Sequence, residues 1–222
     1  MLEQEAVWLG KALAARAGIS PLLCLGSSTE KYRTVDQPYI DEFVYRPLKD
    51  LGVEVVNLDI KLAEGVDVVG DITDPSFRNS QLSCRSWGAV LCSNLLEHVE
   101  DPGQICRAIE DVLPVGGFAF VTGPKRYPLH NDPIDTLFRP SPEELSKFFP
   151  RMMVEEGEEV PDRRFGHYWW RVGDGNPAIR RLQIRGTITG WRRPVRQLRN
   201  LSGWLAPTSA TCLVLRKVVS HD

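Results

Sequence analysis

Residues 21–29 read PLLCLGSST, and this stretch decides the fold. The apolar run at 22–25 is short and closes on Gly-Ser-Ser-Thr, a pattern typical of a buried strand followed by a loop. Every position of the run is apolar, rather than every second one, which predicts a strand covered on both faces of its sheet. Strands of the same kind are expected at 53–58, 66–69, 89–93 and 118–122.

Helical segments separate these strands. Apolar spacing, caps and prolines predict helices over 3–17, 38–51, 101–113 and 141–149, and two later strands over 152–160 and 211–218. Strands that alternate with helices favour a mostly parallel sheet. We therefore expect an α/β, Rossmann-like fold with helices on both faces of the sheet.

Length and composition fit one cytoplasmic domain over 1–222. The net charge is −2, no apolar run is long enough to cross a bilayer, and the first residues lack the basic-then-apolar order of a signal peptide. The odd number of cysteines, none in C-x-x-C spacing, predicts neither a disulfide framework nor a zinc site. No other metal site is expected, and the sequence carries no signal of oligomeric state.

One stretch, 161–204, differs from the rest of the chain. It holds ten arginines and five interleaved Tyr and Trp residues against only Asp162 and Asp174, so the remainder is distinctly acidic. We interpret 161–208 as an insertion or cap before the last strand. It could be a solvated face, a cap for an acidic acceptor, or a peripheral contact with an anionic membrane. The overall negative charge argues against a nucleic-acid partner.

Polar residues follow the predicted strands. Ligands of open α/β sheets bind outside the carboxyl ends of the strands. Gly26 permits close approach of a ligand to the backbone, Asp59 could accept hydrogen bonds from ribose hydroxyls, and Asp71 could accept an amine. Both aspartates could equally cap turns of their own backbone.

The order of these segments carries a resemblance. LLCLGSST (22–29), VVNLDI (55–60), VVGDITD (68–74), AVLCSNLLEHVED (89–101) and LPVGGFAFVTGP (113–124) together resemble class I S-adenosylmethionine-dependent methyltransferases. The match is closest to the group whose fourth strand runs into Leu-Glu-His-Val, and it covers about residues 20–150.

The resemblance implies a seven-stranded sheet with the last strand antiparallel, and S-adenosylmethionine at its carboxyl edge, released as S-adenosylhomocysteine. Gly26, Ser27 and Ser28 would lie under the methionine part. Asp59 would bind the ribose, with Ile60 beside it. Asp71 and Ile72 would flank the adenine, and the floor would be formed by Ser93, Asn94 and Leu95.

The first loop departs from the family pattern. That pattern reads acidic-x-Gly-x-Gly-x-Gly, whereas here Cys24 takes the acidic place, and Ser28 and Glu30 replace two glycines. These departures leave three alternatives open: weaker cofactor binding, a loop of different conformation, or a non-catalytic binding module. An NAD(P)-linked oxidoreductase would need G-x-G-x-x-G, which residues 26–31 do not provide.

The acceptor is expected over residues 125–139 and the arginine-rich stretch. His98 and His130 are candidate general bases, although His98 could be scaffolding and methyl transfer is largely a matter of alignment. Candidate acceptor-binding residues are His130, Asp132, Asp135 and Arg139; the alternative is a self-contained turn. The predicted acceptor is a small or carrier-linked molecule, with a mild preference for a sugar or glycan precursor.

Overall fold

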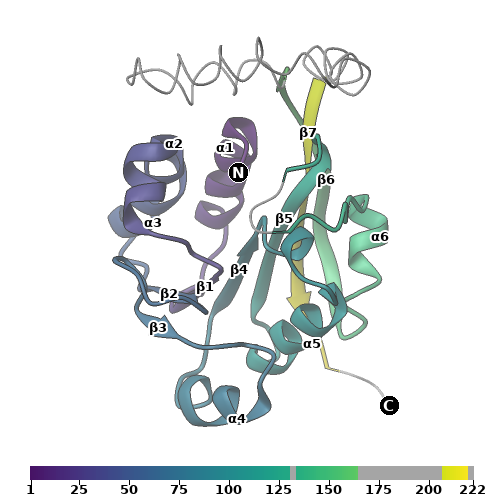
Figure 1. The fold of residues 1–222 in the computed structure, drawn as a ribbon. Helices are drawn as coiled ribbons and strands as arrows, with labels where there is room; N and C mark the ends of the chain where they lie inside the picture. Colours follow the sequence, from purple (N-terminus) through teal and green to yellow (C-terminus); the bar gives the residue numbers. More distant parts are fainter. Residues whose placement is uncertain (131–133, 165–206, 220–222) are drawn as a thin grey trace.

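The computed structural model describes residues 1–130, 134–164 and 207–219. Seven strands form one sheet in the order β3-β2-β1-β4-β5-β7-β6, with β7 antiparallel to both of its neighbours and the other pairs parallel (Figure 1). This arrangement confirms the expected fold class. The strands are β1 (Leu22–Leu25), β2 (Val55–Asp59), β3 (Val68–Val69), β4 (Ala89–Ser93), β5 (Phe118–Arg126), β6 (Met152–Arg164) and β7 (Pro207–Lys217).

Helices cover both faces of the sheet (Figure 1). The α-helices are α1 (Glu3–Ala14), α2 (Pro38–Ile40), α3 (Arg46–Asp50), α4 (Pro75–Phe77), α5 (Pro102–Val112) and α6 (Pro142–Ser146). Short π-helical segments are η1 (Tyr32–Asp36), η2 (Asp41–Tyr45) and η3 (Arg78–Leu82), and η4 (Leu96–His98) is a 3-10 turn. One apolar cluster joins α1 and α3 to the sheet, and the other joins α5 and α6 to the opposite face.

Alternate residues of β1 belong to different clusters. Leu22 and Cys24 pack with α1, whereas Leu23 and Leu25 pack with α5, and all four are at most 3% exposed. A strand buried on both faces has no solvent side that would call for polar residues. The run of four apolar residues at 22–25 is therefore explained by two hydrophobic clusters, one on each side of the sheet.

Helix starts follow the predicted caps. The Asp101 side chain accepts from Gly103 N at 2.9 Å at the start of α5. At α6, Ser141 Oγ accepts from Glu144 N while Glu144 accepts from Ser141 N, which is the expected capping box. Side chains that satisfy first-turn N–H groups fix these two helices to their sequence positions.

Several elements differ from the sequence prediction. The helical stretch of α4 and η3 was not predicted, although Asp74 caps it by accepting from Ser76 N. β5 and β6 both run further than expected, because β7 begins at Pro207 and pairs along their whole length. Residues 161–164 therefore belong to β6. The three interpretations of the arginine-rich stretch concern mainly residues 165–206, which lie outside the described residues.

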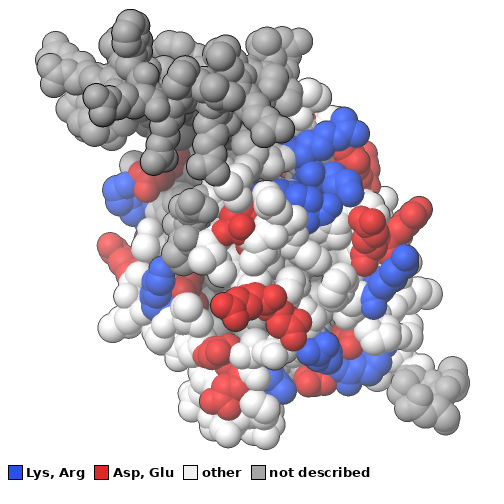
Figure 2. All heavy atoms as spheres, turned by 45° about the vertical axis from the view of Figure 1, so that its right-hand side comes forward, with Lys and Arg blue, Asp and Glu red and all other residues white. Residues whose placement is uncertain are grey.

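The described surface carries more acidic than basic residues, and on the face shown in Figure 2 the two kinds are interspersed. All five cysteines are free thiols, and only Cys84 is exposed. Within the described ranges, no helix is long and apolar enough to cross a membrane.

Candidate functional site

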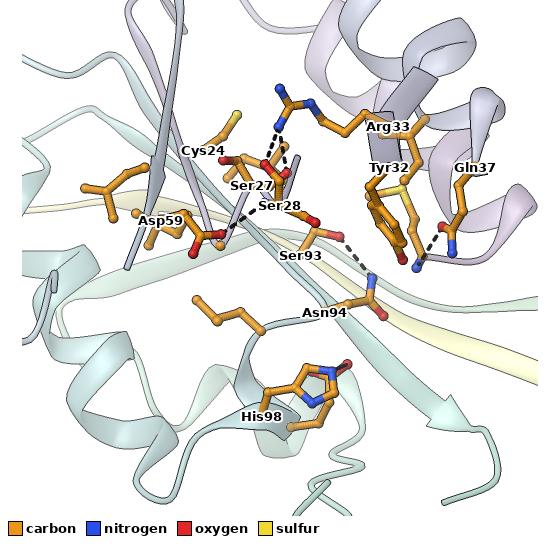
Figure 3. A pocket seen from close by; sticks show the side chains of 18 of the residues that line it. Cys24, Ser27, Ser28, Tyr32, Arg33, Gln37, Asp59, Ser93, Asn94 and His98 are labelled. Carbon is orange, nitrogen blue, oxygen red and sulfur yellow. Dashed lines mark hydrogen bonds and ion pairs between the residues drawn. The ribbon is translucent and has the colours of Figure 1, made fainter. Parts of the chain in front are cut away.

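A cavity of about 1370 Å³ opens at the carboxyl edge of β1, β2, β3 and β4. Its lining comes from the loops after all four strands, together with α2, η2 and the segment around Tyr127. The cavity brings together every cofactor residue predicted from the sequence: Gly26, Ser27, Ser28, Asp59, Ile60, Asp71, Ile72, Ser93, Asn94 and Leu95. Figure 3 shows several of them around this cavity.

The first loop (residues 26–29) keeps a tight turn without its second glycine. Gly26 has φ +61°, and a Cβ there would lie 3.0 Å from Leu95 Cδ1, so a side chain at this position would be strained and would displace Leu95. Ser28 has φ +56°, a left-handed conformation that costs a non-glycine residue on the order of 1–2 kcal/mol. Its N–H donates to Asp59 Oδ2 at 3.1 Å, which links the ends of β1 and β2.

Arg33 binds the backbone of this loop, as Figure 3 shows. Its guanidinium donates to the backbone oxygens of Ser27 and Ser28 at 2.7 and 2.9 Å, and to Gly65 O at 2.9 Å. The residue is 7% exposed and lies over the Tyr45 ring. A buried charge needs such partners. Sequence reasoning missed Arg33, whose carbonyl partners leave no pattern in the sequence.

Cys24 stands where the family pattern has an acid. Burial raises the pKa of the Cys24 thiol to about 12, although a hydrogen bond with Tyr45 opposes the change, so the group is neutral. Ser27 Oγ is also buried and has no hydrogen-bond partner among the described residues. A bound polar ligand would satisfy that hydroxyl, so the first loop fits a cofactor despite the missing acid.

Asp59 serves the backbone and faces the cavity. Its Oδ1 accepts from Lys61 N and its Oδ2 from Ser28 N, both at 3.1 Å, so the turn-capping interpretation is realised. A carboxylate has about four acceptor sites, which leaves capacity for ribose hydroxyls. Asp71 similarly binds Thr73 N and Oγ1 at 2.8 and 2.7 Å.

Glu5 of α1 lies beneath the ends of β4 and β5 and contacts residues that line the cavity. It is 1% exposed, and its Oε1 accepts from Asn94 Nδ2 and Thr122 Oγ1, both at 2.6 Å. Its Oε2 accepts from Leu2 N at 2.8 Å. These contacts fasten the N-terminal helix to the strand ends. Glu5 was also missed, because its side-chain partners lie 89 and 117 residues away in sequence.

Both predicted bases line the cavity. The rings of His98 and His130 are 5.1 Å apart and nearly perpendicular, and His98 Nδ1 lies 2.5 Å from Ile134 O. Burial lowers the pKa of His130, against the opposing effect of Asp135. Beside them, Glu97 is 1% exposed, and burial raises its pKa against the opposing effects of its own backbone N–H and of neighbouring His98. Sequence reasoning treated Glu97 only as part of a motif.

The predicted acceptor residues divide into two groups. His130 lines the cavity, whereas Asp135 and Arg139 pair with each other at 2.6 Å and do not line it. Burial alone would raise the pKa of Asp135, but hydrogen bonds from Arg139, His130 N and Leu137 N lower it to about 2. These contacts match the self-contained turn. Asp132 lies outside the described residues.

Comparison with known proteins places the fold. No family model matches the sequence, and no curated protein does. Among solved structures, the chain is similar to coclaurine N-methyltransferase bound to N-methylheliamine and SAH, with 15% identity, a TM-score of 0.59, and coverage of 97% of this chain and 70% of that one. Phosphoethanolamine N-methyltransferase 2 of Haemonchus contortus, bound to phosphomonomethylethanolamine and S-adenosylhomocysteine, matches with 11% identity and a TM-score of 0.54 over 97% of this chain and 53% of that one.

The fold is therefore that of class I S-adenosylmethionine-dependent methyltransferases. The cyclase SpnF shares it, with 17% identity, a TM-score of 0.55, and coverage of 96% of this chain and 81% of that one. At such identities the likeness concerns the fold alone. A cyclase among the matches shows that one fold supports more than one reaction, so the fold alone does not determine which reaction a site carries out.

Proposed function

We propose that this protein binds S-adenosylmethionine and transfers its methyl group to a small or carrier-linked acceptor. The observation that carries the proposal is the convergence of ten residues, chosen by their positions after four strands, on one cavity. Asp59 is central, because it joins the first loop to the end of β2 and retains acceptor capacity.

Each part of the cofactor has a matching group. Asp59 would accept hydrogen bonds from the ribose diol. Ile60, 68% exposed at the cavity wall, and buried Ile72 would contact the adenine. Gly26 permits close approach of the methionine part, and Ser27 Oγ would gain the partner it lacks. The ligand would thus lie along the rim that the strand ends form.

The bound cofactor supplies an electrophilic methyl group on a sulfonium sulfur. The protein's part in such a transfer is mainly alignment, which can contribute about 7–11 kcal/mol to lowering a barrier. His98 and His130 line the same cavity and could take the proton of an acceptor hydroxyl or amine. With its lowered pKa, His130 is neutral at pH 7 and can accept a proton.

Calorimetry tests the binding step. S-adenosylhomocysteine should bind with one-to-one stoichiometry, whereas NAD⁺ should release no heat. Asp59→Asn should weaken binding about 100-fold, because two hydrogen bonds to a charged acceptor contribute roughly 1.5 kcal/mol each. Glu64→Gln, at an exposed carboxylate, is the matched control. Binding of NAD⁺ alone, or an unchanged Asp59→Asn, would refute the assignment.

Transfer needs a separate test, because a non-catalytic binding module would pass the first one. Cys24 and Ser28, where the family pattern has an acid and a glycine, favour that second candidate. Labelled S-adenosylmethionine incubated with the protein and a cell extract should label a small or carrier-linked product. Tight binding without labelled product in any extract would favour the module. An acidic or sugar-like acceptor held by 161–204 stays a prediction.

A further inference from the structure

We propose that Glu97, His98 and His130 form a binding site for one divalent metal ion. Each offers a ligand atom, and these atoms all lie within 4.8 Å of one another. The three side chains line the cavity beside the loop that follows β4. The metal site itself does not depend on methyl transfer.

The state of Glu97 is the first argument. Its side chain is 1% exposed, and neither carboxylate oxygen has a hydrogen-bond partner among the described residues. An ionised carboxylate is unfavourable in that condition unless a cation lies beside it. Gly123 on β5 faces it without a side chain, and a Cβ there would lie 3.9 Å from Oε2. A cation beside the two oxygens would remove the cost, so the carboxylate points to a missing ligand.

The orientation of His98 is the second argument. Nδ1 lies 2.5 Å from Ile134 O, and because a carbonyl can only accept, Nδ1 carries the proton. In the neutral ring Nε2 then carries the lone pair that a metal ion needs, and it lies 3.7 Å from Glu97 Oε1. Metal-bound histidines commonly donate their other N–H to a backbone carbonyl in this way. Two ligands about 2.1 Å from one ion are separated by roughly 3–4 Å.

His130 has a carboxylate beside its ring. Its Nδ1 lies 3.0 Å from Asp135 Oδ2, although the two atoms are not in hydrogen-bond geometry. Asp135 is itself held by Leu137 N and Arg139. A carboxylate behind a histidine orients the ring and raises its basicity as a ligand.

Two imidazoles and one carboxylate suit Zn²⁺, Mn²⁺, Fe²⁺ or Co²⁺ better than Ca²⁺ or Mg²⁺, which prefer all-oxygen sites. Three protein ligands leave coordination positions open, as in catalytic rather than structural metal sites. An ion here would take an oxygen ligand from the cavity. If the proposed function holds, that ligand would be a hydroxyl or carboxylate of the acceptor, which the ion would orient. With the ion bound, His98 and His130 would hold it and would not act as proton acceptors.

Titration of the full, tag-free, chelator-treated chain with Co²⁺ and Zn²⁺ tests the site, read by calorimetry and by Co²⁺ visible absorption. One equivalent should bind with a spectrum of mixed nitrogen and oxygen ligation. Glu97→Gln and His130→Asn should each weaken binding at least about 10-fold. Glu64→Gln and Cys84→Ser, at an exposed carboxylate and an exposed thiol, should bind as the wild type does.

Circular dichroism of each variant reports whether it folds, and Gln is close enough in shape to Glu to fill the same space. S-adenosylhomocysteine is titrated in the same preparations. Unimpaired metal binding by folded Glu97→Gln and His130→Asn, or no binding by the wild type, would overturn the metal site. Metal binding with no binding of S-adenosylhomocysteine would overturn the proposed function alone.

Discussion

Charged side chains near the first loop have hydrogen-bond partners, whereas the one beside the loop after β4 does not. At the first loop, Asp59 and Arg33 form hydrogen bonds with the backbone. Below them, the Glu5 carboxylate accepts hydrogen bonds from Asn94 and Thr122. Within η4, the Glu97 carboxylate is buried without a hydrogen bond among the described residues. The first set shapes the cavity before any ligand arrives. The second is left to be completed by a ligand, which is why we place an ion there.

The largest expected effect is at the support of His130. Asp135→Asn removes the charge that pairs with Arg139, which is only 13% exposed. Removing one partner of a buried pair leaves the other uncompensated, so the free energy of unfolding should fall by about 3 kcal/mol. Urea denaturation measures it. Glu54→Gln, in the exposed pair with Arg85, should change it by less than about 1 kcal/mol; equal losses would contradict the contrast.

Glu5→Gln tests the contacts that hold α1 beneath the ends of β4 and β5. The amide group must place its NH₂ either toward Leu2 N or toward the donors of Asn94 and Thr122. Two facing donors leave a buried group unsatisfied, which costs about 2 kcal/mol of the free energy of unfolding. Thermal unfolding checks this, with Glu64→Gln as the control. A variant as stable as the wild type would show that Glu5 does not hold α1 to the sheet.

Arg33→Lys tests how the first loop is held. An ammonium cannot reproduce the fork that reaches Ser27, Ser28 and Gly65. We expect S-adenosylhomocysteine affinity to fall about 10-fold, equal to roughly 1.4 kcal/mol. Arg46→Lys, at an exposed ion pair, should leave affinity unchanged in the same calorimetric titration. If both variants bind equally well, the loop does not need this support.

Ser28→Gly should have the smallest effect. Glycine relieves the left-handed φ of +56° but loses more conformational entropy on folding. The net change should be stabilising and at most about 1 kcal/mol, measured by urea denaturation. Ser28→Ala, which keeps the strain, should not be stabilised. A clear loss of stability in Ser28→Gly would mean that the serine side chain, rather than the turn, fixes the loop.

What could be predicted from the sequence follows from local rules. β4 was predicted at its exact bounds, because an apolar run ends on a polar group at Ser93. The residues predicted to bind the cofactor converge on one cavity because parallel strands bring their carboxyl ends to one edge. β5 was predicted too short, because its last residues are paired only by β7, from far along the chain.

The rest of the site depends on contacts that no local pattern encodes. Glu5 is a helix residue like any other until Asn94 and Thr122 are placed above it. Glu97 stands in a familiar motif, and only the fold shows that it lacks a hydrogen bond. Asp135 was a candidate for the acceptor from its position, yet its partners are Arg139 and the turn itself.

A crystal structure with S-adenosylhomocysteine tests the central claim most directly. The account predicts the ribose hydroxyls on the Asp59 carboxylate and the adenine against Ile60 and Ile72. A ligand bound elsewhere, or a rim filled by the chain's own side groups at saturating ligand, would contradict it.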